Sequence, residues 1–251
     1  MIKLNQAVVL AGGRGERLRP LTDEIPKPLV AVNGAPFLDY LINSVIQAGI
    51  KHILILTGYK GEAIIKRYEK LAHEGIEIEC FPGRAEDQTG RRLLNARRLL
   101  DNYFLLLYGD NYWPMELKQM LNLYDEKKTK VLTTVFTNKR GTGEYGYENN
   151  ISVGKDKLVR AYNKSRKSSG LNGVDIGYFI VNKNILNLGI NENISFEEHI
   201  LPRLILKKQL TAYLTDKQYY YITNLDSLKN FESAVAERGF ESIPNNYFKG
   251  R

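Results

Sequence analysis

The chain has 251 residues, 43% of them hydrophobic and 25% charged, which is the composition of a folded globular protein and excludes a disordered one. Its 36 Lys and Arg against 28 Asp and Glu give a net charge of +8, which favours either polyanionic partners (nucleic acid, acidic lipid, phosphorylated small molecules) or a basic, soluble surface. One cysteine excludes an internal disulfide framework, and with three histidines at no metal-ligand spacing we expect no zinc site.

The first predicted element is a strand at residues 3–12, KLNQAVVLAG, a short apolar run that ends at a glycine. The run is too short for a secretory signal and no small-residue cleavage pattern follows it. No stretch approaches the roughly 18 apolar residues of a membrane span. We therefore expect a cytoplasmic protein without a membrane partner.

A glycine-rich turn follows this strand, with Gly12, Gly13 and Gly15. Ligands of open parallel sheets bind at the carboxyl ends of strands, and glycine lets backbone N–H groups approach a phosphate closely. The alternative is a tight strand-to-helix turn that needs glycine for steric reasons alone. Two known phosphate loops are excluded, because the Gly-Lys-Ser/Thr of the mononucleotide loop is absent and Leu18 replaces the third glycine of the dinucleotide loop.

The stretch AGGRGERLRPLTDEIPKPLV, residues 11–30, closely resembles the signature of the sugar-1-phosphate nucleotidylyltransferases, with its internal spacings preserved. The resemblance implies an enzyme that joins a nucleoside triphosphate to a sugar 1-phosphate, giving a nucleotide sugar and pyrophosphate. The sugar phosphate attacks the α-phosphorus in line, so no enzyme serine or cysteine is required. The protein then mainly positions the anions and neutralises their charge.

The same resemblance implies roles for single residues of this stretch. Arg17 matches the catalytic arginine of the family, whose planar guanidinium would bind the triphosphate. Lys27 matches the phosphate-contacting lysine, and the prolines on both sides restrict its backbone. The implied nucleotide-binding positions are Leu10, Ala11, Gly12, Gly13 and Gly15.

Helices and strands alternate after the signature. The hydrophobic periodicity predicts a helix at 36–49, a strand at 51–59, a helix at 61–75 and a strand at 76–81. This pattern is typical of parallel crossover units, in which helices cover a sheet.

The next segment, DQTGRRLLNA at 87–96, stands where the family has a small-residue loop beside the nucleobase. The match nominates Gln88, Thr89 and Gly90 as nucleotide-binding, with Gln88 able to pair with a base edge. Arg91 can hold phosphate at the start of the helix expected at 89–102, or it is solvated on an amphipathic helix. Gln88, Arg91 and Arg92 replace small residues of the family loop, so the resemblance does not imply which nucleobase this chain selects.

The strand expected at 103–110, YFLLLYGD, ends in Gly109 and Asp110. Asp110 matches the metal-ligating aspartate of the family and Gly109 a nucleotide-binding position. The resemblance therefore implies Mg²⁺ as cofactor, a cation that prefers oxygen ligands. Alternatively, Asp110 is an N-cap of the helix expected from Pro114 to Glu126.

The second half is expected to be richer in short strands. A strand at 130–137 is followed by short strands at 149–154, 157–163 and 174–182, a helix at 195–208, paired strands at 210–215 and 219–223, and a helix at 225–239. No linker or repeat divides the chain, so we expect one domain over 1–251. The expected fold is a three-layer α/β/α, Rossmann-like nucleotidyltransferase fold with a mixed, mostly parallel central sheet. Its halves would be a nucleotide-binding half at about 1–137 and a β-rich, sugar-binding half at about 138–251.

Four segments of the second half follow the order of the family: GEYGY, AYNKS, VDIGYFIVN and SFEEHIL. The family lysine is retained in AYNKS, whereas an asparagine replaces the family glutamate and changes one sugar hydroxyl contact. Each residue taken singly is explained equally well as a polar surface residue. The sugar-phosphate-binding residues implied by the resemblance are Gly146, Asn163, Lys164, Asp175 and Glu197.

The late segment YYYITNLDSL departs from the family, which usually has Asp-Ile-Gly-Thr-Pro-Glu-Asp with a second metal ligand. Tyr221 stands where that aspartate is expected. The second ligand is then missing or supplied differently. Asp226 is a weak substitute for it, because Asp226 also fits an ordinary helix-start residue.

The length resembles the compact enzymes for hexose or heptose 1-phosphates and not the acyltransferase fusions. The sequence leaves open the base (guanylyl, cytidylyl, thymidylyl or uridylyl transfer), the sugar and whether the chain forms a homo-oligomer. Its partners are expected to be a nucleoside triphosphate and a sugar 1-phosphate. The alternative is a catalytically weakened relative that binds a sugar nucleotide and regulates a partner. We do not expect nucleic acid as a partner, because the basic residues are spread along the chain and no nucleic-acid module is evident.

Overall fold

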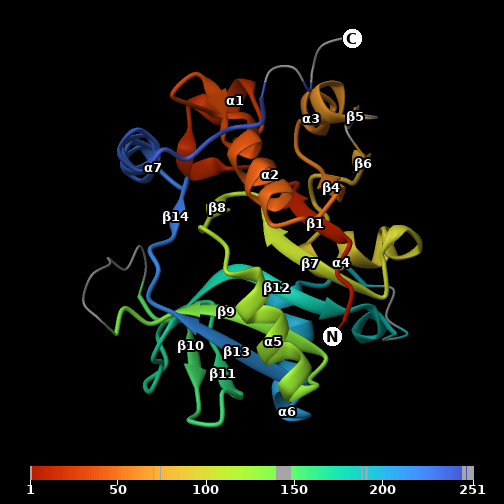
Figure 1. The fold of residues 1–251 in the computed structure, drawn as a ribbon, viewed down its shortest axis with the longest axis vertical. Helices are drawn as coiled ribbons and strands as arrows, with labels where there is room; N and C mark the ends of the chain where they lie inside the picture. Colours follow the sequence, from red (N-terminus) through yellow and green to blue (C-terminus); the bar gives the residue numbers. More distant parts are fainter. Residues whose placement is uncertain are drawn as a thin grey trace. The chain divides into compact units, whose positions relative to one another are not determined.

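The computed structural model describes residues 2–69, 71–73, 75–139, 148–187, 189, 192–244 and 247. Contacts divide the chain into two compact units, each assembled from separate stretches of sequence (Figure 1). The first unit holds Met1–Leu4, Gln88–Leu106 and Trp113–Tyr219, and the second holds Asn5–Asp87, Leu107–Tyr112 and Tyr220–Arg251. The boundary expected near residue 138, between the nucleotide-binding and sugar-binding halves, therefore falls within the first unit. Among the described residues, no helix has the length and apolar character needed to cross a membrane.

Four strands form the sheet of the second unit. β1 (Gln6–Ala11) pairs in parallel with β4 (His52–Thr57), which pairs in parallel with β6 (Ile76–Phe81). β5 (Leu71–His73) lies antiparallel to β6. The helices between these strands are α2 (Phe37–Gln47) and α3 (Gly61–Tyr68). β1 and β4 are buried almost throughout, as expected for parallel strands whose two faces are covered.

An aromatic cluster anchors the remaining parts of the second unit. Phe231 of α7 (Leu225–Arg238) lies with its ring centroid 5.1 Å from those of both Phe37 and Tyr112. Leu18 and Val30, from the segment after β1, are buried in the same cluster, so the core fixes that segment at two points. The shorter elements of this unit are the 3₁₀ turns Glu16–Leu18 and Lys27–Leu29, α1 (Leu21–Glu24), β2 (Ala31–Val32), β3 (Ala35–Pro36), β8 (Asn111–Tyr112) and β14 (Tyr220–Tyr221).

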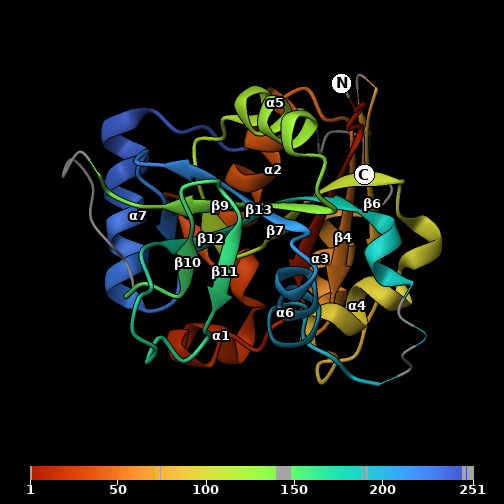
Figure 2. The same ribbon diagram turned by 90° about the horizontal axis from the view of Figure 1, so that it is seen from below.

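The first unit is also a sheet with helices. β9 (Val131–Phe136) pairs antiparallel with β12 (Val174–Asn182) and parallel with β13 (Leu210–Thr215). In Figure 2, α5 (Leu117–Lys127) and α6 (Leu201–Leu206) lie on opposite faces of these strands. Its other elements are α4 (Thr89–Asn95), β10 (Ile151–Val153), β11 (Val159–Tyr162), the 3₁₀ turns Arg97–Leu99 and Lys183–Leu186, and the π-helical turn Phe196–Ile200. β7 (Tyr103–Tyr108) begins in this unit and ends in the second.

The expected mixed, mostly parallel sheet with helices is confirmed, since three of the strand pairs above are parallel and two antiparallel. The helices expected at 61–75 and 89–102 end early, at Tyr68 and Asn95. The helix expected at 195–208 is a π-helical turn followed by the short α6. The expected pairing of 210–215 with 219–223 is wrong, because β13 pairs with β9 and β14 pairs with β8. Residue alternation marks a strand but does not identify its partner.

Candidate active site

The glycine loop after β1 is closed by contacts to its own neighbours in the second unit. Gly15 has a φ of 66°, in the left-handed region that glycine adopts without strain. A Cβ atom on Gly15 would lie 2.9 Å from Cβ of Lys27, and the Thr22 hydroxyl donates to the Gly15 carbonyl at 2.9 Å. Only glycine therefore allows the loop to lie this close to Lys27. At the other end of the loop, Tyr59 N–H donates to the Gly12 carbonyl at 3.1 Å.

Lys27 and Asp110 form an ion pair in the second unit, with Nζ 2.7 Å from Oδ2. Lys27 opens a 3₁₀ turn between Pro26 and Pro28, and both prolines limit the backbone that carries it. The Lys27 side chain is 11% exposed and that of Asp110 is 36% exposed, so the carboxylate remains open to solvent. A bound anion could therefore replace Asp110 beside the Lys27 ammonium. A bound cation could replace Lys27 beside the Asp110 carboxylate.

The end of β7 places Asp110 beside the end of β1. Gly109 N–H donates to the Leu10 carbonyl at 3.0 Å, and a Cβ atom on Gly109 would lie 2.8 Å from that oxygen. Glycine is therefore required for this close approach. Leu10 and Ala11 are the last, buried residues of β1 and contribute backbone to the site. The expected alternative for Asp110 as a helix N-cap is wrong, because α5 begins at Leu117 after Glu116.

The arginines of the loop have different surroundings. Arg17 is exposed in the turn Glu16–Leu18, and its guanidinium makes no hydrogen bond or ion pair with any residue that the structure describes. Arg14 instead pairs with Glu86 at 3.2 Å and lies over the Tyr59 ring. The structure therefore does not bring Arg17 into contact with Lys27 or Asp110, and its guanidinium is available to a ligand.

Tyr221 lies next to the metal-binding candidate. It pairs with Asn111 across β14 and β8, and Ile222 N–H donates to the Asp110 carbonyl at 3.0 Å. Asp226 is exposed in the first turn of α7, as an ordinary helix-start residue is. Within the described ranges, no group of three or more His, Cys, Asp or Glu could hold a metal ion by itself.

In the first unit, the start of α4 is joined to the segment before the π-helical turn. Gln88 N–H donates to the Asn193 side chain at 2.8 Å, and Arg91 N–H donates to the Ile194 carbonyl at 2.9 Å. A Cβ atom on Gly90 would lie 2.8 Å from the same carbonyl. The loop at 88–90 is consequently fixed by backbone contacts that leave no room for a larger residue at Gly90.

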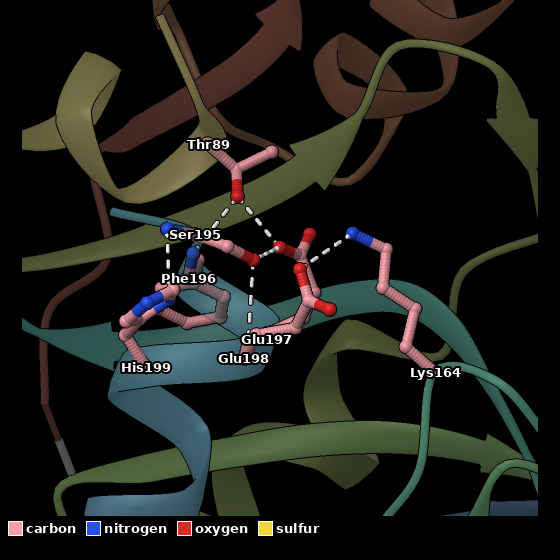
Figure 3. A network of polar contacts seen from close by, with 7 residues as sticks. All are labelled: Thr89, Lys164, Ser195, Phe196, Glu197, Glu198 and His199. Carbon is pink, nitrogen blue, oxygen red and sulfur yellow. Dashed lines mark hydrogen bonds and ion pairs between the residues drawn. The ribbon is translucent and has the colours of Figure 1, made fainter. Parts of the chain in front are cut away.

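A side-chain network completes this junction (Figure 3). The hydroxyls of Thr89 and Ser195 both donate to Oε2 of Glu197, at 2.6 and 2.7 Å, and Phe196 N–H donates to the Thr89 hydroxyl at 2.9 Å. Glu197 is 7% exposed, and these donors offset the cost of burying its polar carboxyl group. One oxygen of Glu197, a sugar-binding candidate, therefore accepts hydrogen bonds from within the protein.

Asp175 is a buried acid on β12 of the first unit. A register shift between Asp175 and Phe179, with Gly177 at a φ of 79°, marks a bulge at its position. Its Oδ1 accepts from the Thr133 hydroxyl at 2.9 Å and from Gly177 N–H at 3.0 Å, whereas Oδ2 is buried without a hydrogen-bond partner in the described part of the chain. Burial raises the pKa of Asp175 to about 7, the bonds from Gly177 and Thr133 oppose this, and the Glu197 charge adds to it.

The neighbours of Asp175 include one residue that the sequence did not nominate. Burial, followed by the negative charges of Asp175 and Glu197, raises the pKa of Tyr162. Tyr162 precedes Asn163 and Lys164, so its place in the AYNKS segment was a usable signal.

The other sugar-binding candidates lie in different surroundings. Lys164 forms an ion pair with Glu198 at 3.0 Å, with both side chains at least half exposed (Figure 3). Asn163 donates to the Ser168 hydroxyl at 2.5 Å. Gly146 lies outside the described residues.

A family model described as nucleotidyl transferase matches residues 6–237. The chain belongs to this family. A D-glycero-alpha-D-manno-heptose 1-phosphate guanylyltransferase of Aneurinibacillus thermoaerophilus is 28% identical over 218 residues, which cover 85% of this chain and 91% of the relative. A probable glucose-1-phosphate cytidylyltransferase of Bacillus subtilis is 25% identical over 247 residues, which cover 90% of this chain and 92% of the relative.

The fold is shared with solved structures as well. HddC of Yersinia pseudotuberculosis complexed with GMP-PN covers 90% of this chain and 97% of its own, with a TM-score of 0.73 and 22% identity. The expected Rossmann-like nucleotidyltransferase fold is thereby confirmed. Family membership also confirms the resemblance found at residues 11–30, and the protein is an enzyme that transfers nucleotidyl groups.

Proposed function

We propose that this nucleotidyl transferase joins a nucleoside triphosphate to the 1-phosphate of a hexose or heptose, giving a nucleotide sugar and pyrophosphate. The observation that carries the proposal is the Lys27–Asp110 ion pair of 2.7 Å beside the glycine loop. It provides an ammonium for phosphate oxygens and a carboxylate for a cation at the carboxyl end of β1, where parallel sheets bind ligands. The names of the two relatives, one acting on a heptose 1-phosphate and one on glucose 1-phosphate, support this substrate class.

The reaction needs little covalent chemistry from the protein. An oxygen of the sugar phosphate forms a bond to the α-phosphorus, and the bond from that phosphorus to the bridging oxygen of pyrophosphate breaks. Lys27 releases Asp110 and binds a phosphate oxygen, while the exposed guanidinium of Arg17 binds the triphosphate. Both residues offset the negative charge that gathers when the two anions meet, and the fixed backbone of Lys27 reduces the ordering that this requires.

The donor set around Asp110 fits Mg²⁺. This ion takes oxygen ligands and is usually held by one or two carboxylates together with substrate phosphates and waters. Asp110 offers one carboxylate that is partly exposed, which suits an ion carried by the triphosphate. When bound, Mg²⁺ would neutralise phosphate charge, and Asp110 would hold it.

The first unit supplies candidates for nucleotide and sugar recognition. Gln88, Thr89 and Gly90 form a fixed loop for the base, and Asp175 offers a buried oxygen without a partner in the described chain. Asp175, Glu197, Asn163 and Lys164 are proposed to contact the sugar phosphate. An enzyme of this kind works where nucleoside triphosphates are made, which supports a cytoplasmic location.

A second candidate function is a sugar-nucleotide-binding regulator with weakened catalysis. Tyr221 favours it, because it occupies the position of an expected second metal ligand and lies beside Asn111. The Lys27–Asp110 pair favours the enzyme.

Pyrophosphate release with Mg²⁺ over a matrix of nucleoside triphosphates and sugar 1-phosphates distinguishes the two. We expect release with at least one pair and none when Mg²⁺ is chelated. Silence throughout, together with measurable binding of a nucleotide sugar, would establish the regulator instead.

A further inference from the structure

A cavity lies within the first unit, formed by the β10–β11 hairpin and the ends of β9 and β13. The cavity has a volume of about 410 Å³, within the range of small-molecule sites. Three lysines line it, namely Lys139, Lys155 and Lys157, and two apolar side chains, Val153 and Leu214, contribute to its wall. None of these residues belongs to the groups described above. We call this cavity the lysine pocket.

The backbone that carries Lys155 and Lys157 is tightly held. Gly154 N–H donates to the Leu158 carbonyl at 2.9 Å, and Lys157 N–H donates back to the Gly154 carbonyl at 3.0 Å. A Cβ atom on Gly154 would lie 2.7 Å from Oδ1 of Asp156, so the small glycine lets the Asp156 side chain lie over this turn. Lys157 itself has a φ of 70°, a left-handed conformation that is uncommon for lysine.

The hairpin is also fastened to its surroundings. The Ala212 N–H of β13 donates to the Lys157 carbonyl at 2.8 Å, and Leu158 forms a bridge with Thr211. The Asn172 amide both accepts from Val153 N–H, at 2.9 Å, and donates to its carbonyl, at 3.0 Å. The hairpin wall of the pocket is therefore preformed, and a ligand does not have to order it.

Among the described residues, no ion pair compensates the charge of the lysine pocket. In the described ranges, no carboxylate forms an ion pair with Lys139, Lys155 or Lys157. The neighbouring acid, Asp156, pairs with Arg160 at 2.5 Å and accepts from Leu158 N–H. Three lysines thus line one cavity, and their like charges raise the local concentration of anions.

We propose that the lysine pocket is a binding site for the diphosphate group of a small molecule, either inorganic pyrophosphate or a nucleoside diphosphate. Lysine ammonium groups are compact point charges that suit phosphate oxygens. A diphosphate carries several negative charges on adjacent phosphates, so it can be shared by three lysines. The apolar Val153 and Leu214 leave space for a less polar part of a nucleoside diphosphate.

Site-resolved lysine labelling tests this site in the full chain. Pyridoxal 5′-phosphate carries a phosphate and forms an imine with a nearby lysine, which borohydride reduces to a stable adduct that peptide mass spectrometry locates. We expect Lys139, Lys155 or Lys157 to be labelled about tenfold more than the exposed control lysines Lys118 and Lys229, as one added ion pair suggests. Inorganic pyrophosphate should suppress that label. Equal labelling of all exposed lysines, or a label that pyrophosphate does not suppress, would overturn the proposal.

A calorimetric titration with a variant provides the second test. The pocket variant is Lys155→Gln/Lys157→Asn. Asparagine is used at position 157 because it tolerates the left-handed backbone there. The number of pyrophosphate molecules bound per chain should fall by one, whereas the Lys118→Gln/Lys229→Gln control keeps the wild-type number. An unchanged number in the pocket variant contradicts the site. Tighter binding of guanosine diphosphate than of pyrophosphate at this site identifies a nucleotide ligand, and equal or weaker binding identifies the diphosphate group alone. Both readouts are independent of the catalytic activity.

Discussion

Lys27 and Asp110 are 83 residues apart in the sequence, and their side chains meet at 2.7 Å. Their meeting depends on two close backbone approaches, one at Gly15 beside Lys27 and one at Gly109 beside the Leu10 carbonyl. The ion pair places an ammonium beside a partly exposed carboxylate, and the proposed function requires a substrate phosphate to replace that carboxylate. At the scale of single residues, the proposed catalysis therefore rests on charge that is positioned in advance.

Replacement of either basic catalytic candidate tests this claim. Lys27→Ala and Arg17→Ala should each lower kcat by about 100-fold or more, the scale for removing one preorganised contact to a developing charge. Arg19→Ala is the matched control, because Arg19 is an exposed arginine of the same segment that pairs with Asp23. Steady-state pyrophosphate release measures all three. Wild-type turnover in both Lys27→Ala and Arg17→Ala would refute the assigned roles.

The buried acid Asp175 predicts a pH dependence of stability. Its pKa is raised from 3.8 to about 7 in the folded chain, so the native state holds a proton that the unfolded chain releases. The free energy of unfolding should therefore fall as the pH rises from about 4 to about 7, by on the order of 4 kcal/mol at most for this group. Asp175→Asn cannot ionise and should lose this part of the dependence. Urea titrations of both proteins at pH 5 and pH 8 measure the difference, and parallel changes in the two proteins would show that Asp175 does not titrate in this range.

Two short segments, and not long helices, determine the geometry of the candidate sites. The loop of residues 12–30 is fixed by Leu18 and Val30 in the aromatic core of the second unit. In the first unit, the start of α4 is fixed by Glu197 in a π-helical turn, an element that often occurs at functional sites. In both cases a polar segment that would otherwise move is held by a small number of specific contacts.

Glycine substitutions in the loop separate a required position from a permissive one. Gly15→Ala places a Cβ atom 2.9 Å from that of Lys27 and forces a φ of 66° on alanine. We expect a loss of about 1–2 kcal/mol in the free energy of unfolding for the backbone conformation alone, with lower turnover as Lys27 shifts. At Gly13 a Cβ atom would meet nothing within 4 Å, so Gly13→Ala should change stability little. Equal stability of the two variants in urea unfolding would be inconsistent with this geometry.

The junction at α4 predicts a difference between two substitutions of one residue. Thr89→Val keeps the shape of the side chain but removes the hydroxyl that donates to buried Glu197 and accepts from Phe196 N–H. The free energy of unfolding should fall by about 1–3 kcal/mol, and KM for the nucleoside triphosphate should rise because the loop at 88–90 is less well positioned. Thr89→Ser retains the hydroxyl and should restore KM. A serine variant as impaired as the valine variant would argue against the hydrogen bonds.

At the scale of the whole molecule, local sequence patterns predicted the helices, the strands and the family. They did not predict how the helices and strands pack together. Hydrophobic periodicity identified β1, β4 and β6, and the glycine and proline spacing of residues 11–30 identified the family. The pairing of β14 with β8 depends on long-range packing, and so does the Asp175 oxygen that has no hydrogen-bond partner among the described residues, so no local pattern contained them. The same holds for the Thr89–Ser195–Glu197 network, which joins residues 108 positions apart.

The most direct test of the central claim follows oxygen atoms through the reaction. Sugar 1-phosphate labelled with ¹⁸O in its phosphate oxygens is incubated with the enzyme, Mg²⁺ and the nucleoside triphosphate that supports turnover, and the products are analysed by mass spectrometry. Direct attack of the sugar phosphate on the α-phosphorus predicts that all of the label appears in the nucleotide sugar and that the pyrophosphate is unlabelled. Label in the pyrophosphate, or triphosphate breakdown without a nucleotide sugar, would contradict it.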